Sequence, residues 1–331
     1  MGNIGKQVAR AIVMHAPGGP EVLQVENVEV GEPGPGQARV RQIAAGVNFH
    51  DIYVRTGLYK TLHLPGIPGL EAVGVVEAVG PGVSEVKVGE RVGCLTPTYS
   101  GYAELRLATA TELIKIPDSI DDVAAAANLL RGLTAQMLVR YVHKVEPGQT
   151  VLVHAAAGGV GRLVCQWAHK LGATVIGTAG SEEKARSARE NGCDEVILYR
   201  KENFVDRVNT ITDKRGVDVA YDAVGKDTFM GSMSCLALRG HLVNYGQASG
   251  PVDPVPMSLL FTKSNSVTRP SVFHYIDTPV RRAQMAADLF DALAKGIVTP
   301  GVIHEYRLED VGRAQQDMEE RKTNGAVILR L

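Results

Sequence analysis

The sequence predicts an α/β protein that combines a doubly wound parallel sheet with a second, barrel-like β domain. Three observations carry this prediction. Residues 8–115 consist of short β-branched runs broken by glycine and proline, and beyond residue 147 strands alternate with helices of about 10 residues. A glycine-rich turn at 155–161 joins the first of those strands to its helix. A chain of 331 residues has room for about two such domains.

The composition is that of an ordinary globular protein. Hydrophobic residues make up 45% of the chain and charged residues 21%, which excludes a disordered or fibrous protein. The 35 Lys and Arg residues nearly balance the 36 Asp and Glu residues, so a broad electrostatic field for nucleic acid or an anionic membrane is not expected. No apolar run has the length of a signal peptide or a transmembrane helix, and we therefore expect a cytoplasmic protein.

The N-terminal part is predicted to be a β domain. Its turns are marked by glycine and proline, as in residues 31–36 and 79–82, and few helices fit between its strands. The predicted strands are 8–14, 38–45, 72–79, 91–95 and 102–108. Runs at this regular spacing are typical of an antiparallel, barrel-like domain.

From residue 119 the pattern changes to that of an α/β sheet. Asp121 and Asp122 precede an alanine-rich segment at 123–128, which indicates the start of a helix. Predicted strands follow at 150–155, 174–179, 195–199, 217–224 and 242–245, and predicted helices at 159–171, 182–191, 204–212 and 278–295. A final strand is predicted at 326–331. We expect this C-terminal tail to return to the β domain, which otherwise lacks helical cover.

The turn at 155–161, AAAGGVG, has the pattern A-x-G-x-x-G counted from Ala156. Gly158 lets the backbone approach a pyrophosphate, and Gly161 allows the helix to pack closely. The helix N-terminus offers free N–H groups to the anion. The sequence therefore predicts a dinucleotide site, with anion contacts at Ala156, Gly158, Gly159, Val160 and Gly161.

The end of the second α/β strand favours NADPH over NADH. An NAD site places an acidic residue there, about 20 residues after the glycine motif, but this chain has Gly180 and Ser181. Together with Lys184 and Tyr199, Ser181 can supply hydrogen-bond donors and positive charge to a 2′-phosphate. The alternative is that Lys184 lies on a solvated helix face and Tyr199 packs on the sheet.

Several motifs in the same order resemble a known family. They are AAGVNFHDIYVRTGLY (44–59), GLEAVGVVEAVGPGV (69–83), LRGLTA (130–135), HAAAGGVGRLVCQWAHKLGA (154–173), YDAVG (221–225) and TRPS (268–271). The chain resembles the zinc-independent quinone oxidoreductases, the ζ-crystallin-like branch of the medium-chain dehydrogenase/reductase superfamily. The resemblance implies a GroES-like domain formed by 1–128 and 272–331, a Rossmann NADPH-binding domain formed by 129–271, a cleft between them, and a homodimer joined through the Rossmann domains.

No metal site is predicted. In the zinc alcohol dehydrogenases of the same superfamily, the positions that match Asn48 and Leu70 carry a Cys and a His ligand, which an amide and an isobutyl group cannot replace. Cys165 and His169 share a helix face but have no evident partners, so core packing is favoured. We expect Glu71 to anchor the cleft through hydrogen bonds. The four cysteines, Cys94, Cys165, Cys193 and Cys235, are widely spaced and predict buried thiols.

The resemblance also implies the roles of individual residues. Asn48 would lie beside the nicotinamide, Tyr53 would line the substrate cleft, and Thr134 would contact the ribose at the nicotinamide end. Tyr59 either lines the cleft or packs its own loop. The remaining residues expected to contact the cofactor are Arg321, Tyr245 and Gln247. His50 is interpreted as a structural histidine in preference to a proton donor.

Without a metal, a conjugated acceptor is the favoured substrate. Quinones and α,β-unsaturated carbonyls spread incoming negative charge over their own π-systems, so the protein mainly has to orient them. The predicted function is NADPH-dependent reduction of quinones, by hydride or stepwise electron transfer. The alternatives are a 2-alkenal or enoyl thioester reductase of the same architecture and, from another class, a single-stranded nucleic-acid binder or an abundant soluble protein. An aromatic content of 5% and the balanced charge disfavour nucleic acid.

Overall fold

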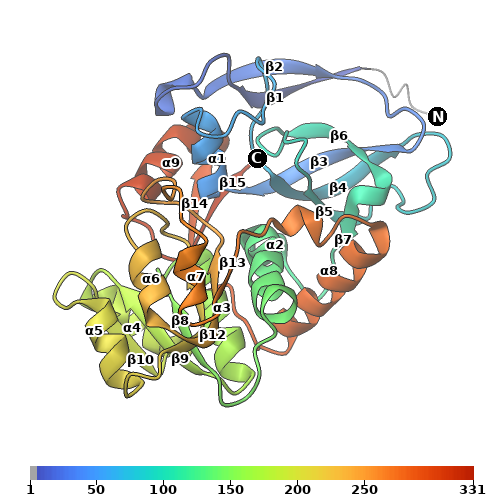
Figure 1. The fold of residues 1–331 in the computed structure, drawn as a ribbon. Coiled ribbons are helices and arrows are strands. Elements are labelled where there is room, and N and C mark those ends of the chain that lie inside the picture. The colour runs from blue at the N-terminus through green and yellow to red at the C-terminus, as the bar shows by residue number, and fades with distance from the viewer. Residues whose placement is uncertain (1–5) are drawn as a thin grey trace. The chain divides into compact units, whose positions relative to one another are not determined.

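The computed structural model describes residues 6–331 and divides into two compact units (Figure 1). Unit 1 comprises Met1–Leu130, Ile276–Ala294 and Pro300–Leu331, and unit 2 comprises Arg131–Tyr275 and Lys295–Thr299. Residues 1–5, which the predicted first domain and the expectation of no signal peptide include, lie outside the described residues. The contact boundaries fall a few residues beyond the predicted domain ends at 128 and 271.

Unit 2 is built on a six-stranded sheet in which every pairing is parallel. Its strands are β8 (Thr150–Val153), β9 (Thr174–Ala179), β10 (Glu195–Leu198), β11 (Val217–Asp222), β12 (Leu236–Asn244) and β13 (Ser266–Thr268). The spatial order is β10-β9-β8-β11-β12-β13, so the direction of winding reverses at β8. This arrangement confirms the predicted doubly wound sheet.

Helices cover both faces of this sheet. They are α3 (Gly159–Lys170), α4 (Glu182–Glu190), α5 (Phe204–Ile211), α6 (Phe229–Cys235) and α7 (Ser258–Phe261). Right-handed crossovers place α3 and α4 on one face and α5 and α6 on the other. Under α5 and α6, Leu152 and Ile176 of the sheet pack against Val208 and Met233 of the helices.

Several predicted ends in unit 2 were wrong. The first strand stops at Val153, because Ala155 has a φ of +52° and no strand continues through that conformation. The strand predicted at 217–224 ends at Asp222, where the chain turns. The strand predicted at 242–245 begins at Leu236, and α6 and β13 were not predicted.

Unit 1 contains a seven-stranded sheet. Six of its strands have the order β14-β15-β3-β4-β5-β7, and the seventh, β6, pairs with β3. The strands are β3 (Gln37–Gly46), β4 (Glu71–Val79), β5 (Arg91–Leu95), β6 (Leu105–Thr109), β7 (Leu113–Lys115), β14 (Ile303–Arg307) and β15 (Ala326–Arg330). All pairings except β14 with β15 are antiparallel. The last strand lies beside β3, with Ile328 opposite Gly46, so the tail joins this sheet.

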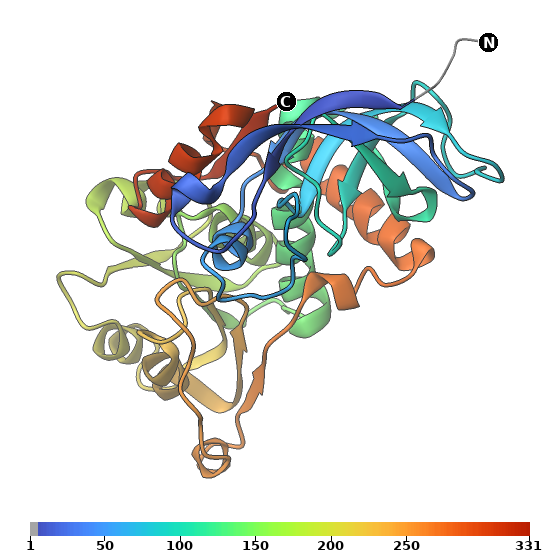
Figure 2. The ribbon, with the colours of Figure 1, turned by 90° about the horizontal axis from the view of Figure 1, so that it is seen from above.

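Other elements of unit 1 differ from prediction. The hairpin of β1 (Gln7–Val13) and β2 (Gln24–Val30), dark blue in Figure 2, contains a strand that was missed. A predicted strand at 102–108 begins only at Leu105. The helices are α1 (Phe49–Arg55), the start of α2 (Asp122–Met137), α8 (Pro279–Ala294) and α9 (Val311–Glu319), of which α1 and α9 were missed.

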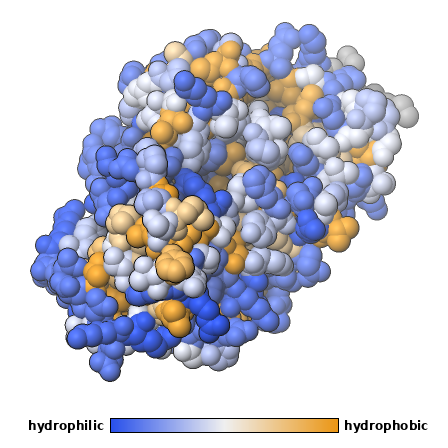
Figure 3. All heavy atoms as spheres, in the orientation of Figure 1, coloured by the Kyte–Doolittle hydropathy of each residue, from blue (hydrophilic) through white to orange (hydrophobic). Residues whose placement is uncertain are grey.

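The β13 edge of the unit 2 sheet has apolar side chains on its surface. Figure 3 shows apolar residues gathered over α6 and α7. Phe261 is 86% exposed, Met257 79% and Met230 56%, and Val267 of the edge strand is also exposed. An exposed strand edge beside apolar side chains is a surface suited to pairing with another chain.

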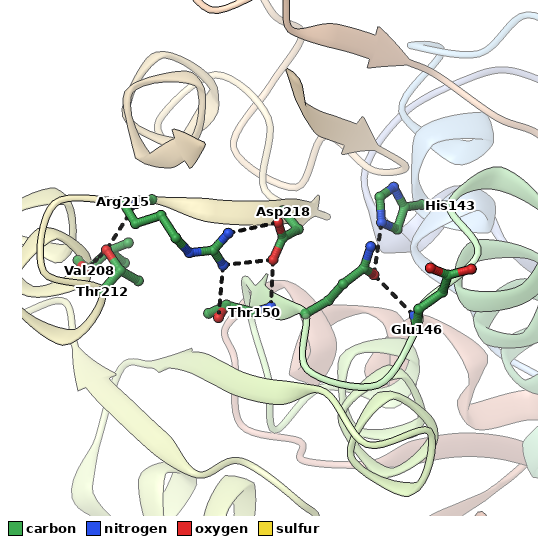
Figure 4. A network of polar contacts seen from close by, with 9 residues as sticks. His143, Glu146, Thr150, Val208, Thr212, Arg215 and Asp218 are labelled. Carbon is green, nitrogen blue, oxygen red and sulfur yellow. Dashed lines mark hydrogen bonds and ion pairs between the residues drawn. The ribbon is translucent and has the colours of Figure 1, made fainter. Parts of the chain in front are cut away.

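The amino-terminal ends of β8 and β11 are joined by a polar network (Figure 4). Asp218 accepts the backbone N–H of Thr150 at 2.8 Å, and Arg215 donates to both of its carboxylate oxygens at 2.8 and 3.0 Å. Burial acts to raise the pKa of Asp218, but these hydrogen bonds outweigh burial and hold the pKa below its usual value. The network closes this end of the sheet, opposite the glycine-rich turn.

Candidate functional site

The glycine-rich turn connects β8 to α3 at the carboxyl edge of the unit 2 sheet. Gly158 is the N-cap of α3, and the backbone N–H of Ala156 donates to the carbonyl of Thr178 in β9 at 3.1 Å. Ala155 has left-handed backbone dihedrals, which a non-glycine residue rarely adopts outside strained or functional turns. A Cβ on Gly161 would overlap the carbonyl oxygen of Ala155. Glycine at position 161 therefore lets the helix start directly against the turn.

This turn fits an anionic group. The first N–H groups of a helix have no partner inside the helix, and the helix dipole adds positive potential there. Gly158, Gly159 and Val160 are partly exposed at the start of α3, and no acidic residue lies in its first turn. A pyrophosphate can therefore approach the backbone at this point.

The tip of β9 carries the second group of predicted residues. Ser181 is the N-cap of α4 and accepts the backbone N–H of Lys184 at 3.3 Å. A Cβ on Gly180 would lie 2.5 Å from the hydroxyl oxygen of Tyr199, so glycine allows that hydroxyl to approach the strand tip. Tyr199 follows β10 and is 41% exposed. Ser181, Lys184 and Tyr199 thus lie around one corner of the sheet edge.

Two acidic side chains also occupy the first turn of α4. Glu182 forms an ion pair with Lys201 at 2.6 Å, which balances its charge, and Glu183 is exposed. Neither stands at the strand tip itself, which is formed by Ala179, Gly180 and Ser181.

The loops after β11 and β12 are fixed by a residue that the sequence analysis did not single out. Asp222 is fully buried, and its Oδ1 accepts the N–H groups of Val224 and Gly225 at 2.8 and 3.0 Å. Its backbone carbonyl accepts the N–H of Tyr245 at 2.9 Å. Buried Gln247 lies next to Gly225, where an added Cβ would be 2.9 Å from its Cα. The motif YDAVG was the available signal for this connection.

Unit 2 therefore brings most of the predicted cofactor residues to one edge of its sheet. They are Ala156, Gly158, Gly159, Val160, Gly161, Gly180, Ser181, Lys184, Tyr199, Tyr245 and Gln247. The carboxyl edge at the point where winding reverses is where doubly wound sheets bind ligands. Thr134 is half-buried in α2 and is not part of this group.

In unit 1, Asn48 is held by a buried carboxyl group. Its Nδ2 donates to Glu71 Oε1 at 2.8 Å, and the other carboxyl oxygen of Glu71 accepts the backbone N–H of Leu130 at 2.7 Å. Glu71 is fully buried, and a Cβ on Gly46 would overlap its carboxyl group. Glu71 therefore makes two buried hydrogen bonds within unit 1, while its expected role in the cleft stays a prediction. Leu70, at the other position considered for zinc, is buried.

Asn48 is also the N-cap of α1. Its backbone N–H donates to Asp51 Oδ2 at 2.8 Å, and the hydroxyl of Tyr102 donates to the same oxygen at 2.7 Å. Asp51 is fully buried, so these bonds fix the start of the helix firmly. The helix in turn sets the positions of His50 and Tyr53.

Aromatic rings surround His50. The ring of Tyr59 packs edge-on against both His50 and Tyr53, with centroids 5.1 and 5.2 Å apart. His50 Nε2 lies 3.0 Å from the hydroxyl of Tyr99, which is also hydrogen-bonded to Thr61. Burial lowers the pKa of His50 to about 4, so the ring is neutral near pH 7. These contacts fit the interpretation of His50 as structural, and they show that Tyr59 packs within this cluster.

The neutral His50 predicts a loss of stability in mild acid. The pKa of His50 is about 4 in the folded state and about 6.5 when unfolded. The stability of the folded state that depends on a neutral His50 is therefore fully present above pH 6.5 and is lost as the pH falls towards 4. Between pH 7.5 and 5 this one group should lower the free energy of unfolding by about 2 kcal/mol. Urea unfolding at both pH values measures it.

A His50→Gln variant, which does not titrate in this range, should lose less stability than the wild type over the same pH interval. The matched control is His169→Gln, because the side chain of His169 is 54% exposed. If His50→Gln and the wild type respond equally to pH, the neutral state of His50 does not govern acid stability.

Arg321 lies just beyond α9 in unit 1, exposed and with a φ of +61°. Its backbone N–H donates to the carbonyl of Met318 at 3.1 Å. The preceding helix is fixed to α1 by Arg55, which donates to both oxygens of Glu319 at 2.8 Å. The sequence analysis did not predict this ion pair, because its partners are far apart in the chain.

The thiols and potential metal ligands of residues 6–331 do not form a metal centre. No group of three or more His, Cys, Asp and Glu side chains in this part of the chain is arranged to hold a metal ion. Cys94, Cys165, Cys193 and Cys235 are all free and buried, as predicted. Within the same residues, every helix is too short or too polar to cross a lipid bilayer.

The two units together define a medium-chain dehydrogenase/reductase. Residues 34–118 match the alcohol dehydrogenase GroES-like domain, and residues 159–289 match the zinc-binding dehydrogenase family. These matches confirm the predicted combination of a GroES-like and a Rossmann domain.

Individual relatives show to which family within this superfamily the chain belongs. A quinone oxidoreductase of Pseudomonas aeruginosa is 44% identical over 323 residues, which are 97% of this chain and 99% of the relative. A 2-haloacrylate reductase of Burkholderia sp. is 44% identical over 96% of this chain and 98% of its own length. A solved structure of Escherichia coli quinone oxidoreductase complexed with NADPH matches with a TM-score of 0.94 and 39% identity, covering 98% of this chain and 100% of that one. The chain belongs to the quinone oxidoreductase family of oxidoreductases.

Proposed function

We propose that this protein reduces quinones with NADPH and without a metal. The observation that carries the proposal is the carboxyl edge of the unit 2 sheet, where a glycine turn at a helix N-terminus lies beside a strand tip without an acid. The related Escherichia coli quinone oxidoreductase, solved with NADPH, supports the same cofactor for this chain.

The residues at this edge fit NADPH. The turn at Gly158 and Gly161 would hold the pyrophosphate at the free N–H groups of the helix start. Lys184, Ser181 and the hydroxyl of Tyr199 would hold the 2′-phosphate through charge-assisted hydrogen bonds. Tyr245 and Gln247 would contact the cofactor from the loop after β12, with Arg321 and Thr134 as the remaining proposed contacts.

Lys184→Ala should weaken NADPH binding by about 1.5 to 3 kcal/mol and leave NADH binding nearly unchanged. The reason is that only NADPH has the 2′-phosphate that the lysine would pair with. Dissociation constants for both cofactors, measured by titration of the purified protein, test this.

Lys170→Ala is the matched control, because Lys170 is exposed at the far end of α3. It should bind both cofactors as the wild type does. Equal losses for NADPH and NADH in Lys184→Ala would place Lys184 outside the phosphate pocket.

On the substrate side, Asn48 and Tyr53 are the proposed contacts. Bound NADPH supplies a hydride, or its electrons stepwise, from the nicotinamide. An amide NH₂ has two donors, and Asn48 uses one on Glu71, so the second can orient the reacting groups. Tyr53 would offer an aromatic ring to a flat acceptor, and the ring of Tyr59 packs against it with the centroids 5.2 Å apart.

The function is tested by following NADPH oxidation with a panel of benzoquinones and naphthoquinones. The second candidate class is the predicted alternative of 2-alkenals and enoyl thioesters, to which the 2-haloacrylate reductase among the relatives adds conjugated carboxylates. Quinone reduction without alkenal or haloacrylate reduction supports the proposal. Reduction of the unsaturated carbonyl compounds alone favours the second class.

Zinc independence is part of the proposal. Asn48 and Leu70 offer no ligand atoms of the kind zinc prefers. Elemental analysis of protein purified without chelator should find far less zinc than protein. Stoichiometric zinc that is required for activity would contradict the proposed metal-free chemistry.

We also propose a cytoplasmic homodimer. Four free buried cysteines suit a reducing compartment. The exposed β13 edge, flanked by Phe261 and Met257, is the proposed dimer contact. Light scattering should give twice the chain mass for the wild type and a lower mass for Phe261→Glu, and a monomeric wild type would contradict the dimer.

A further inference from the structure

Two of the buried cysteines lie in direct contact on the α3 side of the unit 2 sheet. The thiol of Cys193 donates to the sulfur of Cys165 at 3.3 Å, and both thiols are free. Cys165 is in α3, and Cys193 follows Gly192 after the end of α4. The pair therefore joins α3 to the segment that follows α4, and the N-termini of these two helices form the proposed cofactor site.

The thiol pair also packs beneath the glycine-rich turn. A Cβ on Gly177 in β9 would lie 2.6 Å from the sulfur of Cys193 and 2.7 Å from the Cβ of Ala156. Cys193 and the turn residue Ala156 thus both pack against the sheet at Gly177. Gly192 has a φ of +95°, and a Cβ there would be 3.1 Å from the carbonyl oxygen of Cys165. Because this region is closely packed, a movement of the two sulfurs should also move the glycine-rich turn.

We propose that Cys165 and Cys193 are a site of reversible oxidation to an intramolecular disulfide, and that this disulfide weakens dinucleotide binding. The oxidant is a hydroperoxide. The effect on binding rests on the proposed NADPH function, whereas formation of the disulfide does not.

The chemistry has two balanced steps. Residue Cys193 is 6% exposed, and its sulfur attacks one oxygen of H₂O₂, so that a sulfenic acid and one water are formed. The sulfur of Cys165 then displaces the hydroxyl group, which leaves as a second water with the thiol proton, and the S–S bond forms. The two thiols together lose two electrons and two protons, and one H₂O₂ takes them up to become two waters. Burial makes the first step slow, and contact between the sulfurs makes the second fast.

The disulfide changes the geometry under the turn. An S–S bond is about 2.05 Å long, so the sulfurs must approach by roughly 1.2 Å from their contact distance. That movement draws α3 toward the segment that follows α4. Because the turn and the tip of β9 would hold different phosphates of one ligand, this movement should weaken about one charge-assisted hydrogen bond and lower the affinity by roughly tenfold. NADH should be affected as well, since its pyrophosphate would use the same turn.

Peptide mapping tests formation of the bond. The reduced full-length protein is treated with H₂O₂, its remaining thiols are alkylated, and it is digested with trypsin without reduction. Cleavage after Arg and Lys places Cys165 in peptide 163–170 and Cys193 in peptide 190–200. We expect these two peptides to be joined, and to separate after treatment with dithiothreitol. If both remain as separate alkylated peptides, or carry sulfinic acids, the proposal is wrong.

Binding measurements test the consequence. The NADPH dissociation constant of the oxidised protein should rise roughly tenfold and return to its starting value after reduction. Cys193→Ala should form no cross-link and keep its NADPH affinity after peroxide. The matched control Cys94→Ala, which removes a buried thiol of unit 1, should still form the cross-link.

The outcomes separate the two proposals. A cross-linked protein with unchanged NADPH affinity contradicts the coupling between the thiols and the turn. If Cys193→Ala does not fold, Cys165→Ala removes the same bond, and the wild-type peptide map decides alone. Reduced protein that fails to bind NADPH contradicts the proposed function, while the peptide map still reports the thiol pair.

Discussion

Replacing Gly161 by valine is expected to weaken NADPH binding by roughly 100-fold, the largest effect we predict for a single substitution at the cofactor edge. A Cβ at this position would overlap the carbonyl oxygen of Ala155 and lie 3.0 Å from its carbonyl carbon. Both are backbone atoms of the turn and cannot move aside as a side chain can. The turn or the start of α3 must shift, and with it the N–H groups that would meet the pyrophosphate.

Isothermal titration with NADPH and with NADH measures this effect, and both cofactors should be affected alike. Gly31→Val is the control, because Gly31 has open space for a side chain and lies in unit 1. Urea unfolding is recorded in parallel, so that lost binding can be distinguished from lost folding. A folded Gly161→Val protein that binds NADPH as the wild type does would remove the turn from the proposed site.

Glu71→Ala is expected to lower the free energy of unfolding by about 3 to 5 kcal/mol. The substitution leaves the amide of Asn48 and the N–H of Leu130 without this acceptor, and both groups are buried. It also opens a cavity beside Gly46. Because Asn48 loses the bond that orients its amide, quinone turnover should fall further than the loss of folded protein explains.

Urea unfolding and steady-state kinetics of the folded fraction measure the two effects of this substitution. Glu71→Gln keeps the size of the side chain but directs an NH₂ group at one of the two donors, so it should lose less stability than Glu71→Ala. The control is Glu85→Ala, which removes an exposed acid of the same unit. If Glu71→Ala is no less stable than Glu85→Ala, the carboxyl group does not anchor this region.

Local patterns explain which elements could be predicted. Residues 174–179, with the β-branched sequence TVIGTA, lie between a glycine turn and a serine cap, and β9 has the predicted bounds. In contrast, α1 has the β-branched and aromatic sequence FHDIYVR, whose propensity does not favour a helix. The missed signal was its cap, because Asn48 stands three residues before Asp51. Strand β2 was missed because most of its residues are exposed and its sequence has few apolar positions.

The sequence by itself determined the proposed dinucleotide turn, because the residues that form it are contiguous in the chain. A strand, three glycines and a helix start between Thr150 and Gly161 would form the proposed anion site through local backbone geometry. The absence of an acid at the tip of β9 is equally local, so the preference for NADPH could be argued before any fold was known.

Only the tertiary structure decided which side chains meet across the chain. Asn48 and Glu71 are 23 residues apart, and Cys165 and Cys193 are 28 apart, yet each pair is in contact. Periodicity and caps define faces and ends of single elements, but they carry no information on the distance between side chains of different elements. That distance is set by strand register and helix packing, which depend on the whole core.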